Sequence, residues 1–168
     1  MSLPRTVVAL SLLSIFFAVA TAAETSLPAA IAAPGEAPVL TAHAIGTQIY
    51  ECKAGADGKL AWAFLEPAAT LTANDKIVAH HYAGPTWEFT DGSAVVGKAV
   101  GNAPGKTAND ITWLKLDVVS RRGSGTGSEV VTVQRINTVG GVITGECDHA
   151  NATRAMPYSA DYIFLRKG

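Results

Sequence analysis

The residues best suited to chemistry are concentrated between His80 and Gly97, in the segment HHYAGPTWEFTDGSAVVG. This segment combines two histidines, two carboxylates and three aromatic side chains with turn-forming proline and glycine. Such a mixture suits an exposed loop surface that binds a small molecule, a glycan or a partner in the cell envelope. A structural protein of the cell envelope or secretome, without a small ligand, is the alternative that involves no binding site. The residues expected to form this ligand-binding surface are His81, Tyr82, Trp87, Glu88, Asp91 and Arg135.

The same segment also permits a second hypothesis, a secreted hydrolase or metal-dependent enzyme. An enzyme requires several acidic and histidine side chains to converge within about 4–6 Å of each other, with shifted pKa values. Metal-ligand motifs such as CxxC or HExxH are absent, and His80 and His81 point to opposite faces if they lie on a strand. We therefore expect no metal and assign no catalytic residue. The candidates for the enzyme hypothesis are His80 or His81, Glu88, Asp91, His149 and Asp161.

Asp161 is unusual because it shares a strand face with Ile163 and Leu165. A carboxylate among apolar residues needs a partner if that face is buried. The sequence offers Arg135 as the partner, in a structural ion pair. On this interpretation Asp161→Ala destabilises the protein more than Asp91→Ala, because Asp91 only forms a turn with Gly92.

The three tryptophans, Trp62, Trp87 and Trp113, either fill a β core or stack against sugar rings. Trp113 alternates with charged residues and is expected to be the most exposed. Asn151 begins a glycosylation sequon, which has meaning only in a eukaryotic secretory pathway. No cofactor is expected, because the glycine-rich segment before Lys106 has three residues between its glycines where a P-loop needs four.

The N-terminus has the features of a secretory signal peptide over residues 1–22: a basic residue, an apolar stretch and a small-residue cleavage site. This predicts an exported protein, periplasmic or secreted, without a membrane span once the signal is removed. Removal of Arg5 leaves twelve basic against fourteen acidic residues. Such a nearly neutral chain argues against nucleic acid as a partner.

The chain has two cysteines, Cys52 and Cys147. In an exported protein they are most simply explained by one disulfide. Closing so long a loop stabilises the folded state by roughly 4–5 kcal/mol in the chain-entropy model. Free thiols or metal ligation, with Cys147 and His149 joined by one of the histidines of the segment, are the alternatives.

The 168 residues fit one domain with 48% hydrophobic and 16% charged residues. Residues 23–43 are rich in proline and alanine and predict an extended lead-in. From Ala44 to Gly168 no segment keeps a helical period, whereas short alternating stretches separated by Asp-Gly and Gly-Gly turns recur. This pattern predicts an all-β domain, a single antiparallel β-sandwich or barrel of about eight strands.

Several blocks together resemble a known family. In order they are YEC at 50–52, HYAGPTW at 81–87, DGS at 91–93, ITWL at 111–114, QRINTxGG at 134–141, Cys147 and YSADY at 158–162. They resemble the family called domain of unknown function 3455, found in exported bacterial proteins and in fungi. The resemblance covers about Ala44–Leu165 and implies one fold unit with a cysteine pair. It implies no substrate.

Overall fold

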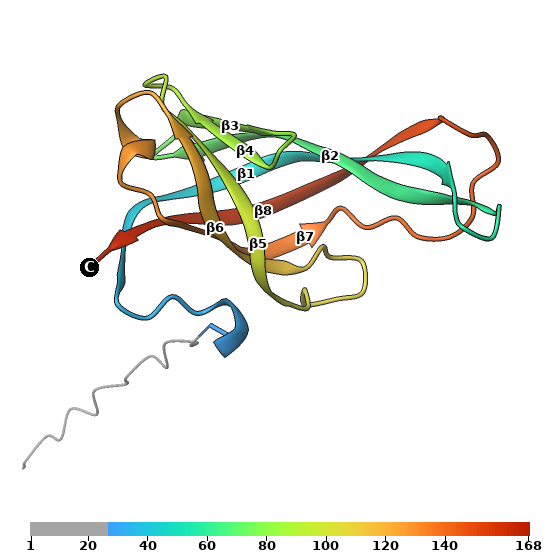
Figure 1. Ribbon diagram of the computed structural model, residues 1–168, viewed down its shortest axis with the longest axis horizontal. Helices are drawn as coiled ribbons and strands as arrows, with labels where there is room; N and C mark the ends of the chain where they lie inside the picture. Colours follow the sequence, from blue (N-terminus) through green and yellow to red (C-terminus); the bar gives the residue numbers. More distant parts are fainter. Residues whose placement is uncertain (1–26) are drawn as a thin grey trace, which may run out of the picture.

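The alternating segments form a single antiparallel sheet that closes on itself (Figure 1). The computed structural model describes residues 27–168, so the expected signal peptide lies outside the described residues. The all-β prediction is confirmed, and of the two expected architectures the barrel is the one observed. The elements in chain order are η1 (Ala29–Ile31), β1 (Glu36–Ala54), β2 (Leu60–Ala73), β3 (Lys76–Tyr82), β4 (Thr86–Phe89), β5 (Ala94–Ala103), β6 (Trp113–Arg122), η2 (Thr126–Ser128), β7 (Thr132–Gly140) and β8 (Thr153–Lys167).

Each strand pairs with the next along the chain, and β8 returns to pair with β1. The β1–β8 ladder is long, from Glu36 opposite Lys167 to Glu51 opposite Thr153. Closure leaves the barrel without an unpaired sheet edge in its wall, which protects the strands from pairing with other chains.

Two strands are longer than their sequence suggests. β1 begins at Glu36, eight residues before the expected start at Ala44, because Pro38 is tolerated beside a register shift in the ladder with β8. β2 continues to Ala73 through Pro67. A bulge between Ile49 and Tyr50 of β1 lies close to Pro67, as expected for a proline inside a sheet.

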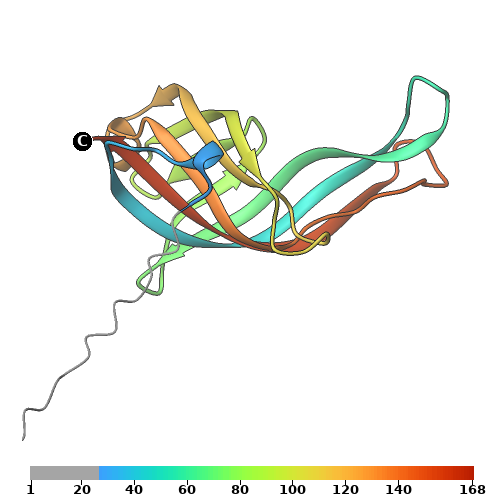
Figure 2. The same ribbon diagram turned by 90° about the horizontal axis from the view of Figure 1, so that it is seen from below.

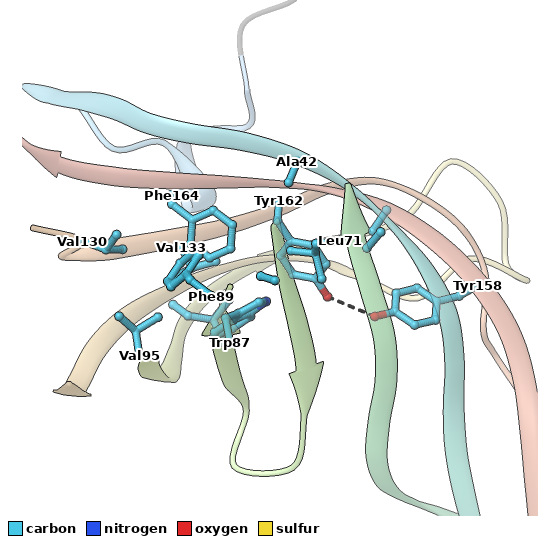
Figure 3. Close-up of a cluster of buried hydrophobic side chains, with 14 of the residues drawn as sticks. Ala42, Leu71, Trp87, Phe89, Val95, Val130, Val133, Tyr158, Tyr162 and Phe164 are labelled. Carbon is cyan, nitrogen blue, oxygen red and sulfur yellow. Dashed lines mark hydrogen bonds between the residues drawn. The ribbon is translucent and has the colours of Figure 1, made fainter. Parts of the chain in front are cut away.

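One end of the barrel is filled by large apolar side chains. Figure 3 shows Phe164 of β8 among Phe89, Val95, Val130 and Val133. Phe89 and Phe164 meet edge to face, with ring centroids 5.1 Å apart. This packed end is where the hydrophobic core of the barrel is densest.

A short loop seals the packed end from outside. Asp91, in the turn after β4, accepts hydrogen bonds from the backbone and hydroxyl of Ser93 and from the backbone and hydroxyl of Thr126 in η2. Ser93 Oγ in turn accepts from the Gly127 amide at 2.9 Å. These hydrogen bonds hold the pKa of Asp91 far below its usual value. Asp91 therefore anchors the loop that covers the core.

The N-terminal segment covers part of the outer wall. Ile31 is fully buried and packs with Ile136, beside Trp113 and Ile163. Gln134 donates a hydrogen bond to the Ile31 carbonyl oxygen at 2.6 Å. The outside of the barrel is thus apolar where this segment lies on it.

The β1–β2 hairpin extends beyond the barrel, and the segment between β7 and β8 runs beside it (Figure 2). The predicted disulfide between Cys52 and Cys147 joins the two, with Cα atoms 5.9 Å apart. Backbone hydrogen bonds flank the bridge, from Cys147 to Leu60 and from Asn151 to Cys52. The disulfide thus fastens a long connection to the projecting hairpin, and it suits an oxidising compartment.

The expected ion pair between Asp161 and Arg135 is wrong. Arg135 lies opposite Tyr162 in the β7–β8 register, so it shares the inner face with Tyr162, whereas Asp161 is on the outer face. There Asp161 accepts hydrogen bonds from His43 at 2.8 Å and from Asn137 at 2.9 Å. Its side chain remains one-third exposed. Among residues 27–168, no helix is long and apolar enough to cross a membrane.

We predict that Cys52→Ser lowers the stability of the oxidised protein by roughly 4 kcal/mol, since the bridge restricts a loop of about 95 residues in the unfolded chain. Urea denaturation of the wild type, of Cys52→Ser and of the variant lacking both cysteines measures the change. The two variants should have equal midpoints, and the reduced wild type should match them. A midpoint unchanged by Cys52→Ser would show that the bridge contributes nothing.

We also predict that Asp91→Ala destabilises the protein by about 2 kcal/mol, more than Asp161→Ala, which reverses the order expected from the sequence. Asp91 accepts four hydrogen bonds, two of them from Thr126 of η2, while Asp161 accepts two on the outer wall. Paired urea melts of the two variants test this order. A larger loss for Asp161→Ala would mean that the η2 loop adds little to the core.

Candidate functional site

The other end of the barrel is open and contains a cavity of about 700 Å³. Along each strand, the inward side chains pass from the packed end to the open end. On β4, Phe89 lies at the packed end and Trp87 at the cavity; on β8, Phe164 lies at the packed end and Tyr162 at the cavity. The cavity is therefore the unfilled half of the barrel interior. All eight strands contribute to its wall, through Gln48 and Tyr50, Phe64 and Pro67, His81, Trp87, Ala99, Leu114 and Leu116, Arg135, and Tyr162.

Small residues among the inward positions account for the empty volume. Gly97 of β5 faces inward, and a Cβ there would lie 3.0 Å from the Trp87 ring, so glycine is what allows the indole to cross the barrel. Ala99 follows and is exposed at the mouth. An eight-stranded barrel is just wide enough for its side chains to fill it or to hold one small ligand. In this barrel, the small inward residues at one end leave room for one small ligand.

The floor is buried and the rim is exposed. Trp87 and Tyr162 of the floor are at most 1% exposed, whereas Phe64 and Leu65 of the rim are 54% and 45% exposed. This gradient gives the cavity an apolar entrance and a floor from which water is largely excluded. The lining thus resembles the usual pocket for a small organic molecule, mostly apolar with a few polar groups.

His81 presents a neutral acceptor inside the barrel. Its ring stacks on Trp87 with centroids 4.4 Å apart, and its Nδ1 lies 2.9 Å from the Thr86 carbonyl oxygen. A carbonyl oxygen only accepts, so Nδ1 carries the proton and Nε2 keeps its lone pair. Burial lowers the pKa of His81 to about 4. The imidazole is therefore neutral at physiological pH.

Two tyrosines on β8 line and support the floor. The hydroxyl groups of Tyr158 and Tyr162 lie 3.3 Å apart (Figure 3). Burial raises the pKa of both phenols, so both stay protonated. Tyr50 donates its hydroxyl proton to the Gly141 carbonyl oxygen at 2.8 Å. Gly141 has φ +87°, and a Cβ there would collide with Tyr158, so glycine is needed where this segment meets the floor.

Among the described residues that line the cavity, Arg135 is the one cation. Its Nε and Nη2 atoms donate to the Thr112 carbonyl oxygen at 3.1 and 2.8 Å. No carboxylate of the described residues comes within ion-pair distance of it. Its charge lowers the pKa values of Tyr50, His81 and both β8 tyrosines, although burial outweighs this effect for the phenols.

Two further polar groups of the wall lack partners. The side-chain nitrogen of Gln48 and the indole nitrogen of Trp87 are buried without a hydrogen bond to any described residue. Both residues line the cavity. A buried donor left unpaired costs roughly 1–3 kcal/mol, so such groups in a native protein commonly bond to water or to a ligand.

The structure separates the six residues expected to form one surface. His81, Trp87 and Arg135 meet in the cavity. Tyr82 and Glu88 lie on the outer face, where the Tyr82 hydroxyl and Arg122 both donate to Glu88 at 2.6 Å. These hydrogen bonds lower the pKa of Glu88, and the bond from Tyr82 has the largest effect. The sixth residue, Asp91, lies at the packed end, where it anchors η2.

The groups of the enzyme hypothesis do not converge. His80 points outward, opposite Glu88, while His81 points into the barrel. Cys147 is in the disulfide and so is not available with His149 for a metal. Among residues 27–168, no group of three histidine, cysteine or acidic side chains is placed to hold a metal ion.

The tryptophans are distributed differently from the expectation. Trp113, expected to be the most exposed, is half-buried under the N-terminal segment with its indole nitrogen unpartnered. Trp62 is also half-buried, and the guanidinium of Arg154 lies 5.3 Å from its ring centroid. Neither presents a bare platform for a sugar ring.

Sequence reasoning missed Gln48, Tyr50, Tyr158 and Tyr162 as site residues. The signal was present, because alternation places Gln48 and Tyr50 on one face of β1, and Tyr158 and Tyr162 on one face of β8. What was lacking was the knowledge that these faces line an incompletely filled interior.

We predict that His81 makes stability fall as pH drops from 6.5 to about 4. The unfolded chain binds a proton near 6.5 and the folded protein only near 4, so acid favours unfolding within this window. The shift corresponds to about 3 kcal/mol. Urea melts across the window should show this loss in the wild type and in His80→Gln, and lack it in His81→Gln. Identical pH profiles for wild type and His81→Gln would refute a buried neutral imidazole.

Comparison with known proteins agrees with the resemblance seen in the sequence blocks. A family model described as a protein of unknown function, DUF3455, matches residues 33–74 and 72–166. No curated protein and no solved structure gives a significant match. The matched segments include every strand of the barrel and every residue of the cavity wall. The chain belongs to the DUF3455 family.

Proposed function

We propose that this protein is an exported binding protein that takes a small, largely apolar molecule into the open end of its barrel. The observation that carries the proposal is the cavity of about 700 Å³ to which every strand contributes. Its volume lies within the range of pockets for small organic ligands, roughly 300–1,000 Å³. The apolar rim formed by Phe64 and Leu65 gives such a molecule a route to the floor.

The division of the barrel into two ends supports a binding role. Stability is supplied by the packed end, by the η2 loop and by the disulfide, none of which requires the cavity to be filled. The open end keeps unpaired donors on Gln48 and Trp87. A protein of this size would gain stability by filling that space with larger side chains, so the retained cavity is better explained by an occupant.

Export to the periplasm or the exterior is part of the proposal. The signal-peptide pattern of residues 1–22 and the disulfide between Cys52 and Cys147 both support it. A carrier or receptor for a poorly soluble molecule would suit such a compartment. The binding site that we propose is the barrel interior, not the outer surface around Tyr82 and Glu88 that the sequence suggested.

The direct test is binding of the neutral fluorophore N-phenyl-1-naphthylamine, whose emission rises in apolar surroundings. We predict saturable one-to-one binding by the wild type. Ala99→Trp places an indole at the mouth, and Ala99 is exposed, so the fold tolerates it while the apparent affinity falls at least tenfold. The matched control is Lys98→Trp, which adds the same ring on the opposite face of β5.

Equal binding by Ala99→Trp and Lys98→Trp would place the fluorophore outside the cavity. Absence of saturable binding by the wild type would contradict the proposed function. Circular dichroism melts of both variants establish that the fold is retained.

A further inference from the structure

The position of Arg135 narrows the chemistry of the molecule that the cavity takes. Arg135 follows Val133 on the inner face of β7, with Leu114 and Tyr162 as its neighbours across the strands. Arg135 is only partly buried, and a charge that has lost part of its contact with water favours a nearby counter-charge. This arginine has no ion-pair partner among the described residues.

The hydrogen bonds of Arg135 orient the guanidinium without neutralising it. Nε and Nη2 donate to the Thr112 carbonyl oxygen, an uncharged acceptor at the rim. A guanidinium has five N–H donors, so this contact leaves Nη1 and one Nη2 hydrogen for other acceptors, among which is the neighbouring Tyr162 hydroxyl. The planar fork of donors that remains matches the geometry of a carboxylate.

Among the other described ionisable groups of the wall, Asp110 alone is charged, and it forms no ion pair with Arg135. His81 is neutral, and the tyrosines keep their protons. Asp110 is the one acid among the described lining residues, and its oxygens already accept from the Gly140 amide and from the amide and hydroxyl of Thr107. These hydrogen bonds lower the pKa of Asp110, and the bond from the Gly140 amide has the largest effect. Its carboxylate holds the rim loop rather than Arg135.

The charge of Arg135 influences ionisable groups on several strands of the cavity wall. Burial dominates the pKa values of Tyr50, His81 and the β8 tyrosines, and the charge of Arg135 adds a smaller contribution that lowers each of them. The positive charge is therefore local to Arg135, which lies beside apolar wall residues, while Asp110 supplies the opposite charge in the rim loop. The charge of Arg135 favours an anion, and the apolar wall favours a hydrocarbon or aromatic body attached to it.

We propose that the ligand is an amphipathic carboxylic acid whose carboxylate pairs with Arg135 while its apolar body fills the cavity. This inference rests on the proposed binding function and specifies its ligand class. A single arginine with one free fork suits a singly charged planar carboxylate better than a doubly charged phosphate. The neutral Nε2 of His81 and the donor of Gln48 are available to a hydroxyl or carbonyl group on the body.

The test is competition against N-phenyl-1-naphthylamine at pH 7.5 with ligands matched in all but the head group. The first set is decanoate, decan-1-ol and decylamine, and the second is 2-naphthoate and 2-naphthamide. We expect the carboxylates to displace the fluorophore at concentrations about tenfold lower than the neutral members, because a charge-assisted pair is added. Decylamine should be the weakest of the decyl set.

The matched variants are Arg135→Gln, Arg135→Lys and Arg166→Gln. Arg135→Gln should abolish the preference for carboxylates while binding the neutral ligands as before. Arg135→Lys, which keeps the charge but not the fork, should retain part of the preference. Arg166→Gln removes the same charge beyond Phe164 at the packed end of β8, where the side chain is half-exposed and lies near Glu129, and should leave the preference intact. If Arg135→Gln fails to fold, Arg135→Lys still separates charge from geometry.

The outcomes distinguish the two proposals. Equal displacement by acids, alcohol and amide, with the fluorophore still bound in the cavity, overturns the carboxylate inference and leaves the binding function standing. A carboxylate preference that survives in Arg135→Gln assigns the anion to another residue and likewise overturns the inference. Failure of the fluorophore to bind the wild type overturns the binding function and the inference together.

Discussion

Pairing between the first and last strands is the constraint on which the rest of this molecule depends. The β1–β8 ladder brings Glu36 opposite Lys167 at one end and Glu51 opposite Thr153 at the other. Without it the sheet would have two open edges and no interior. Pairing between the two ends of a chain has a high entropic cost. The intervening chain must be ordered before the contacts between the two strands stabilise the fold. The disulfide from β1 to the segment before β8 acts between the same two parts of the chain.

Closure creates an interior, and the sequence divides it into two halves. Phenylalanine and valine fill the end beneath η2, while Gly97, Ala99 and the aromatic floor leave space at the other. The packed end supplies stability and fixes the strand register. The open end can therefore keep features that a core would not tolerate, including a cation without a counter-ion and unpaired donors on Gln48 and Trp87. This separation between a stabilising half and a binding half is the basis of the proposed function.

Much of the fold could be predicted from alternation alone. The inner face of β8, with Tyr158, Ala160, Tyr162 and Phe164, follows from the two-residue period, as does the alternation of Leu114 and Leu116 with Lys115 on β6. The disulfide and the family also follow from the sequence. The choice between sandwich and barrel does not, because it depends on whether the end strands meet.

The error over Asp161 shows where local patterns stop being informative. Both faces of β8 are apolar, the inner one because it forms the core and the outer one because Ile163 lies under the N-terminal segment. Alternation separates the two faces but does not tell which is inside. Only the register, with Arg135 opposite Tyr162, places the arginine in the cavity and the aspartate outside. The site likewise consists of side chains from all eight strands, whose proximity no short segment encodes.

The central claim, that the barrel interior is the binding site, is tested most directly by the three indole N–H resonances in a ¹H–¹⁵N NMR spectrum, assigned with single Trp→Phe variants. Trp87 lies on the cavity floor, whereas Trp62 and Trp113 are outside the barrel. Titration with N-phenyl-1-naphthylamine should shift the Trp87 resonance strongly and leave the other two nearly unchanged. A shift confined to Trp62 or Trp113, or no shift of Trp87 at saturation, would contradict the account.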